Sequence, residues 1–127
     1  MIDALFSSSN YVATKKMLDA TALRAEAISS NIANISRPGY KRIDLAPGFE
    51  SQMQAAVQNG DAESVASIKP TLAVDENAVA SQRDGNTVEL EDEMLAMSEN
   101  SMAHATETQL LTGSMLRLRL AITGRPS

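Results

Sequence analysis

The sequence predicts an all-α protein in which long N- and C-terminal helices form an antiparallel coiled coil, with a short middle helix and an extended or partly disordered central arm. Apolar residues recur at helical spacing in both terminal segments. Aromatic residues make up only 3% of the 127 residues, which is typical of Ala-, Leu- and Met-rich helices that pack along seams. The first third of the chain is basic and the last third acidic, which favours antiparallel pairing. We therefore divide one domain into an N-terminal helix (residues 1–35), a central part (36–86) and a C-terminal helix (87–127).

The N-terminal helix is predicted from an apolar stripe along one face. Polar residues at positions 7–10 interrupt the pattern, so the regular helix is expected to begin after them. Beside the stripe runs a second row, made mostly of alanine, which would let another helix approach closely. The stripe comprises Tyr11, Leu18, Ala22, Ala25, Ile28, Ile32 and Ile35, and the second row comprises Ala13, Met17, Ala20 and Ala27.

A turn is predicted at residues 37–40, where the first helix must end. Pro38 sets the backbone of the second turn position, and Gly39 supplies the positive φ of the third. Asn31 and Asn34 precede the turn, and we expect their side chains to cap exposed backbone groups.

The rest of the central part predicts little regular structure. Residues 45–59 have the spacing of a short amphipathic helix, which Gly60 stops. Residues 61–83 show no sustained period, and Pro70 with its polar neighbours argues against a central strand. This stretch is the predicted extended or partly disordered arm.

The C-terminal helix is the longest predicted element. Asn86 is the expected N-cap with Glu89 completing a capping box, and Gly124 and Pro126 are stop signals. Apolar residues recur with the 3.5-residue period typical of coiled coils, although polar residues fill the centre of the seam. The seam comprises Leu90, Met94, Met97, Ser101, His104, Thr108, Leu111, Met115, Leu118 and Ile122, and a second apolar row beside it comprises Leu95, Met102, Leu116 and Leu120.

The length of this helix indicates that it needs partners outside the chain. At about 1.5 Å per residue, residues 87–123 span roughly 55 Å, which is more than a small domain can cover. Because one antiparallel helix cannot cover both apolar rows, we expect the far end of the helix to contact neighbouring subunits. The expected coiled-coil and assembly contacts are Leu18, Ile28, Ile32, Leu111, Met115, Leu116, Leu118, Leu120 and Ile122.

Charge changes sign along the predicted C-terminal helix. Carboxylates from Asp84 to Glu107 precede Arg117 and Arg119, an order that complements the helix dipole. One interpretation is that these charges stabilise and solubilise the helix. The other is that its acidic end meets a basic surface on the next subunit.

The composition argues against several classes of function. A net charge of -5 argues against nucleic acid as the main partner and offers nothing to an anionic membrane. The chain has no cysteine, and hence no disulfide framework or Cys-ligated metal. It has no apolar run long enough for a membrane span, and its first residues lack the features of a secretory signal. By these signs alone the protein would be cytoplasmic.

The sequence shows no catalytic constellation. His104 has no second histidine or cysteine with which to bind a metal, so we expect a packed or hydrogen-bonded core histidine. Ser101 lacks the glycine turn that accompanies a serine nucleophile. Residues 91–93 point to different helix faces, so we expect these acids to be solvated. We therefore expect no enzyme, cofactor, metal or small-molecule substrate, and the residues alone predict a helical self-assembling or adaptor protein.

Two segments resemble a known family. Residues 31–41 resemble the N-terminal motif of the bacterial flagellar rod, hook and hook-associated axial proteins, with Ser36 and Arg37 standing where that family more often has an acidic residue or Asn and then Thr. Residues 84–100 and 116–122 resemble the closing helix of one branch, the proximal rod proteins. The residues that carry the motifs are Asn31, Ala33, Asn34, Pro38, Gly39, Tyr40, Asp84, Gly85, Asn86, Val88, Leu90, Glu91, Glu93, Met94, Met97, Glu99 and Asn100.

The resemblance implies a structural subunit of the flagellar basal-body rod. Its terminal helices would form an antiparallel coiled coil that lines the inner tube, and it would join the membrane-embedded base and export gate to the rest of the rod. Its partners would be other rod proteins and copies of itself. The resemblance also implies export by the flagellar type III apparatus without a cleaved signal, and assembly in the periplasm instead of the cytoplasm. The alternatives are another rod protein of this family, and a soluble helical adaptor or export chaperone.

Overall fold

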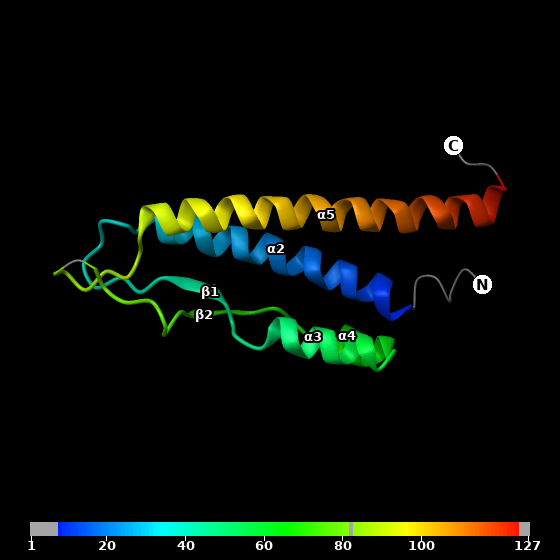
Figure 1. Ribbon diagram of the computed structural model, residues 1–127, viewed down its shortest axis with the longest axis horizontal. Helices are drawn as coiled ribbons and strands as arrows, with labels where there is room; N and C mark the ends of the chain where they lie inside the picture. Colours follow the sequence, from blue (N-terminus) through cyan, green and yellow to red (C-terminus); the bar gives the residue numbers. More distant parts are fainter. Residues whose placement is uncertain (1–7, 82, 125–127) are drawn as a thin grey trace.

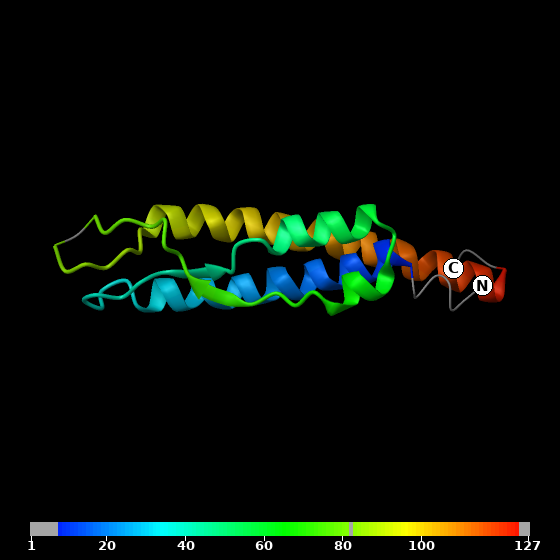
Figure 2. The ribbon, with the colours of Figure 1, turned by 90° about the horizontal axis from the view of Figure 1, so that it is seen from below.

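Helix α2 (Ser9–Ala33) is the middle of three layers in the computed structural model, which describes residues 8–81 and 83–124. Helix α5 (Leu90–Thr123) runs antiparallel to α2 along one side (Figure 1). The short helices α3 (Phe49–Gln58) and α4 (Ala62–Ser67) lie side by side on the opposite side of α2 (Figures 1 and 2). Strands β1 (Ile43–Leu45) and β2 (Leu72–Val74) connect these short helices to the end where α2 stops and α5 starts. The prediction of long N- and C-terminal helices is confirmed.

Helix α2 begins at a serine cap. The Ser8 side chain accepts a hydrogen bond from the backbone N–H of Tyr11 at 3.2 Å. The helix therefore includes Ser9 and Asn10, and the expectation that it begins only after residues 7–10 is wrong. The helix ends at Asn34, whose backbone N–H bonds to the carbonyl of Ser30. Residues 1–7 of the predicted N-terminal segment lie outside the described residues.

The alanine row of α2 faces the two short helices. Ala13 and Ala20 are buried and belong to the main apolar core. The small side chains allow the close approach that the sequence predicted. The partners of these alanines in the core are Phe49, Met53, Ala56 and Val65.

Helix α3 matches the predicted middle helix but begins four residues later. Leu45 belongs to β1, and Gly48 at the N-cap has φ 93°, a left-handed conformation that suits glycine. At the other end Asn59 is the cap and Gly60 has φ 68°, as expected of a C-terminal stop.

The predicted arm at residues 61–83 contains regular structure that the sequence did not indicate. Val65 of α4 is 0% exposed, so this helix is part of the core. Strand β2 pairs antiparallel with β1 in the register Ile43↔Val74 and Leu45↔Leu72. Pro70 precedes the strand and so removes no ladder bond, and in a two-stranded sheet both strands are edges.

Helix α5 begins later than predicted. Its N-cap is Glu89, and no side chain caps it, so the capping box expected from Asn86 and Glu89 is wrong. The C-terminal stop is confirmed, because Gly124 has φ 68° and donates its N–H to the carbonyl of Leu120 at 2.7 Å. Pro126 lies outside the described residues.

The predicted apolar seam of α5 makes only part of its contact with α2: His104 and Met115 reach Thr21 and Tyr11 on α2, but most other seam residues are exposed. The buried residues of α5 are Glu93, Ala96, Asn100, Glu107 and Leu118. By contrast, Met94 is 58% exposed and Ile122 59%. The polar face turns toward α2 because its buried side chains find hydrogen-bond partners there, which offsets the cost of burying them. The apolar seam is therefore left on the surface of the single chain, apart from Leu118 and half-buried Leu111.

Candidate functional site

The two sequence motifs meet at the end of the molecule where α2 stops and α5 starts (Figure 1). Backbone bonds join them: the N–H of Gly39 donates to the carbonyl of Asp84 at 2.9 Å, and the N–H of Thr87 donates to the carbonyl of Tyr40 at 3.0 Å. Gly39 has φ 74° and Gly85 has φ 82°, so the predicted positive φ of Gly39 is confirmed. A Cβ on Gly85 would lie 3.8 Å from Cα of Gly39. We call residues 31–42 together with 84–93 the motif junction.

Asn86 closes the end of α2 instead of capping α5. It is 1% exposed, and its Nδ2 donates to the carbonyls of Asn34, Ile35 and Arg37 at 3.0, 3.1 and 2.8 Å. These carbonyls lie at the C-terminal end of the first helix, where backbone acceptors have no partner within the helix. A residue 49 to 52 positions away in sequence supplies the donor, which local pattern reading cannot detect.

Asn31 links three elements through one buried side chain. Its Nδ2 donates to the carbonyl of Ile43 at 2.8 Å, and its Oδ1 accepts from the N–H of Ile43 at 2.9 Å. The same Nδ2 lies 3.1 Å from Oε2 of Glu93 on α5. Asn31 is 0% exposed, and these bonds use both its donor and acceptor groups. Asn31 thus caps backbone groups as expected, but those of Ile43 on β1. Asn34 caps its own helix, because its side chain donates to the carbonyl of Ser30 at 2.8 Å.

Arg42 is the centre of an ion-pair cluster. Its Nε donates to Glu93 at 2.7 Å, its Nη1 to Asp75 at 2.5 Å and its Nη2 to Asp44 at 3.2 Å. Arg24 of α2 bonds the other oxygen of Asp44 at 3.0 Å. Burial alone would lower the pKa of Arg42, but the bonds to Glu93 and Asp75 raise it above the ordinary value. The guanidinium therefore stays charged. It joins three parts of the chain: β1, α5 and the segment that follows β2.

The expectation that Glu93 is solvated is wrong. Its side chain is 0% exposed because Arg42 and Asn31 reach it from the chain segment that follows the turn. Helical spacing placed Glu93 on a separate face from its acidic neighbours, but spacing alone cannot identify a partner 51 residues away. The one available signal was a basic residue, Arg42, directly after the N-terminal motif.

A second polar layer lies halfway along the α2–α5 contact. The Thr21 hydroxyl is 2.8 Å from Nδ1 of His104 and 3.3 Å from Oε2 of Glu107. Asn100 donates its Nδ2 to the Thr21 carbonyl at 2.8 Å. Burial raises the pKa of Glu107, and the bond to Thr21 and the nearby His104 act in the opposite direction. His104 is hydrogen-bonded as expected but exposed, not packed in a core.

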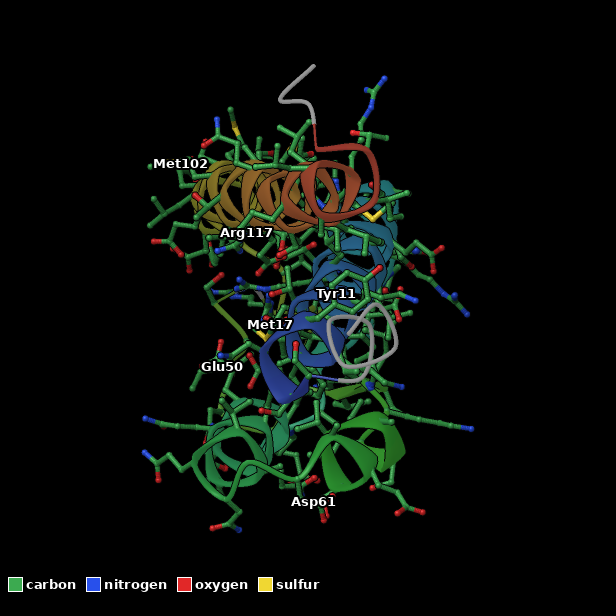
Figure 3. The ribbon with its side chains drawn as sticks, turned by 90° about the vertical axis from the view of Figure 1, so that its right-hand side faces the viewer. Tyr11, Met17, Glu50, Asp61, Met102 and Arg117 are labelled. Carbon is green, nitrogen blue, oxygen red and sulfur yellow. The ribbon has the colours of Figure 1, made fainter. Side chains whose placement is uncertain are left out.

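Helix α5 carries large apolar residues that are exposed, some on the side away from α2 and others, such as Met115 beside Tyr11, at the edge of its contact with α2. Their side chains are between 42% and 71% exposed, and Met102, the most exposed, projects away from α2 (Figure 3). We call these exposed residues together the apolar face of α5. It comprises Leu90, Met94, Leu95, Met97, Met102, Met115, Leu116, Leu120 and Ile122.

The remaining predicted site residues divide between interior and surface. Ile28, Leu118, Val88 and Asn100 are buried, while Leu18, Ile32, Leu111 and Tyr40 are half-buried. Ala33, Pro38, Asp84, Glu91 and Glu99 are exposed. The structure thus brings the motif residues Asn31, Asn34, Gly39, Tyr40, Gly85, Asn86 and Glu93 together, and leaves Leu90, Met94 and Met97 on the apolar face of α5.

Within residues 8–81 and 83–124 there is no group of three His, Cys, Asp or Glu side chains that could hold a metal ion. Among the helices of these same residues, none combines the length and hydropathy needed to cross a membrane. The contacts of the motif junction fix the relative position of two long helices, and α5 presents its apolar face.

Three relatives from different bacteria carry the same name. No family model matches it. A flagellar basal body rod protein FlgB of Cereibacter sphaeroides is 32% identical over 107 residues, which cover 80% of this chain and 84% of the relative. FlgB of Escherichia coli is 28% identical over 131 residues, which cover 91% of this chain and 92% of the relative. FlgB of Borrelia hermsii is 26% identical over 113 residues, which cover 75% of this chain and 82% of the relative.

Proposed function

Because the chain belongs to the FlgB family of flagellar basal body rod proteins and is a structural subunit of that rod, not an enzyme, we propose that it assembles through the apolar face of α5. This face is the observation that supports the proposal. Soluble monomers rarely expose large contiguous apolar patches, whereas Leu95, Met102 and Leu116 are 59%, 71% and 50% exposed. Each such side chain contributes on the order of 1.5 to 3 kcal/mol when fully removed from water.

We further propose that α2 and α5 act as one rigid pair, the antiparallel coiled coil of the inner tube wall. The motif junction supports this role because Asn31, Arg42 and Asn86 tie the end of α2 to the start of α5. The predicted parts, residues 1–35, 36–86 and 87–127, would then work as a single domain. The polar contact between the helices sets their register, and the apolar face remains for neighbours.

The proposed partners are other rod proteins and further copies of this chain. In this proposal the subunit joins the membrane-embedded base and export gate to the rest of the rod. It reaches the periplasmic part of the basal body through the flagellar type III apparatus. The names of the relatives support a rod subunit over a soluble adaptor or export chaperone.

The test is a charged substitution on the apolar face. Leu116→Asp places a carboxylate where a neighbour would bury a leucine, so we expect normal export but loss of the subunit from purified basal bodies and loss of swimming. Gln109→Asp, at another exposed position of α5, is the matched control and should assemble normally. Wild-type incorporation of the Leu116→Asp protein would show that this face is not the interface.

A further inference from the structure

We propose that the exposed methionines in the first half of α5 are an oxidation site, and that their conversion to methionine sulfoxide in the free subunit prevents its assembly. The site comprises Met94, Met97 and Met102, which we call the methionine patch. The inference rests on the proposed function, because the patch is part of the apolar face of α5. It adds a chemical modification that controls this face.

The methionines of the chain differ sharply in exposure. The structure describes six of the seven. Met53 of α3 is 4% exposed and belongs to the apolar core, and Met17 of α2 packs against that core. By contrast, the three methionines of the patch are 58%, 42% and 71% exposed, and Met102 projects away from α2 (Figure 3). A dissolved oxidant therefore reaches the sulfurs of the patch, whereas the fold shields Met53.

The patch is a continuous part of one surface. At about 1.5 Å per residue, Met94 and Met102 are about 12 Å apart along the helix axis. At about 100° per residue, Met94, Met97 and Met102 fall within about 140° of the helix circumference. Another exposed methionine, Met115, lies about 20 Å farther along, and its sulfur is 3.8 Å from the hydroxyl of Tyr11 on α2. A neighbour that covers one methionine of the patch therefore covers all three.

Thioether sulfurs are the most readily oxidised groups of this chain, because it contains no cysteine and no tryptophan. The oxidant that we consider is a peroxide. The lone pair of the sulfur attacks one peroxide oxygen, and the O–O bond breaks. That oxygen stays on the sulfur as S=O after its proton passes to the departing hydroxide, which leaves as water. The sulfur loses two electrons, and the peroxide gains them.

Oxidation changes the polarity of the patch without changing its charge. Methionine is flexible and polarisable, and it suits apolar surfaces that adapt to more than one partner. The sulfoxide is polar and disrupts such surfaces, because a neighbour would bury the S=O oxygen without a hydrogen-bond donor. Neighbours that already cover the patch exclude the oxidant. Oxidised free subunits are therefore kept out of the rod, and assembled subunits are protected.

The test follows one pool of subunits through assembly. The full chain is expressed before the other flagellar proteins, in cells that lack its natural copy and the methionine sulfoxide reductases. A pulse of hydrogen peroxide, ended with catalase, oxidises part of this pool, and the remaining flagellar genes are then induced. Mass spectrometry compares the sulfoxide fraction at each methionine between isolated basal bodies and unincorporated protein.

We expect at least about tenfold less sulfoxide at the patch in basal bodies than in the unincorporated protein. Met53 should carry little sulfoxide in either pool, because it is buried. Equal sulfoxide fractions at the patch in the two pools overturn the inference. This comparison uses the wild-type chain, so it does not depend on how a variant folds.

Leucine substitutions separate the sulfur from the apolar surface to which it belongs. The triple variant Met94→Leu, Met97→Leu and Met102→Leu keeps the volume and apolar character of the patch, so its incorporation should be the same with and without the peroxide pulse. Met17→Leu with Met53→Leu is the matched control and should stay as sensitive as the wild type. A triple variant that loses incorporation after the pulse as the wild type does would overturn the inference.

Reversal separates a specific modification from general damage. The two methionine sulfoxide reductases, one for each sulfoxide epimer, restore the thioether with a thiol as reductant. Their expression after the pulse should return the wild-type protein to basal bodies. Equal sulfoxide fractions together with a loss of assembly in Leu116→Asp would remove this inference and leave the proposed function intact.

Discussion

At the scale of single residues, Arg42 makes more ion pairs than any other residue that the structure describes. Its guanidinium contacts Glu93, Asp75 and Asp44, which belong to segments far apart in sequence. Burying charges is costly unless their partners remain, so the cluster stabilises the fold only as a complete set.

We predict that Arg42→Met destabilises the protein by about 3 to 5 kcal/mol, because Glu93 would stay buried without its cation. Urea unfolding followed by circular dichroism measures the change. Arg119→Met, at an exposed site, is the control and should change stability by less than about 0.5 kcal/mol. Equal effects of the two substitutions would contradict a structural role for the cluster.

Because of Glu107, we expect the stability of the folded protein to depend on pH in an unusual way. Burial raises its pKa above the ordinary value of 4.5, so the folded state binds the proton more tightly than the unfolded chain. The α2–α5 contact should therefore gain stability from this group as the pH falls through the raised pKa toward 4.5, and lose it as the pH rises.

The measurement compares the wild-type protein with Glu107→Gln across this pH range. The variant should be relatively more stable at neutral pH, and the difference should shrink as the pH falls. Groups remote from Glu107 titrate equally in both proteins, so the difference reports Glu107 together with its neighbour His104. A difference that does not change with pH would mean that Glu107 is not perturbed in the folded chain.

At the scale of elements, the turn after α2 depends on backbone conformation. Gly39 has φ 74°, and a Cβ added there would meet no atom within 4 Å. The Cβ of a substituted residue would therefore clash with nothing, and the positive φ is the constraint that a substitution tests.

We predict that Gly39→Val costs more than about 1 kcal/mol because a β-branched residue disfavours positive φ. Bacteria that carry this variant should export the protein but assemble few rods. Swimming assays and the composition of purified basal bodies would measure this. Gly113→Ala in α5 is the matched control. It too has open space around the added Cβ, and helix propensity should make it stabilising by about 0.5 to 1 kcal/mol. Normal swimming of the Gly39→Val strain would refute the argument.

At the scale of the whole molecule, the free subunit should be unevenly stable. The motif junction contains the buried groups Asn31, Asn86 and Glu93, whereas the last turns of α5 expose Met115, Leu116 and Leu120. A subunit that is exported through a narrow channel would benefit from a fold completed only by its neighbours.

We predict that the purified subunit at micromolar concentration is only partly helical, with the termini least protected. Hydrogen exchange should be faster for residues 110–123 than for residues 90–104, because the junction holds the start of α5. Assembly into rods should slow exchange at the far end. Uniform strong protection of the monomer would argue that neighbours are not needed to complete the fold.

The sequence by itself determined the features that depend on nearby residues. Helical spacing located the two long helices and α3, and the glycines at positions 39, 60 and 124 marked the turn and two helix ends. These signals are local because helix formation, capping and positive φ depend on a few consecutive residues. The motifs around Asn31 and Asn86 also identified the family before any contact was known.

Only the tertiary structure decided which face of α5 meets α2. The 3.5-residue period revealed an apolar stripe, but a stripe does not state whether its own chain or a neighbour will cover it. Hydrogen bonds from Asn31, Arg42 and Thr21 satisfy the polar face, and these partners are 51 to 86 residues away in sequence. The pairing of β1 with β2 is likewise non-local. Burial of a polar group is favourable only when its partner is in place, and the fold alone brings such distant partners together.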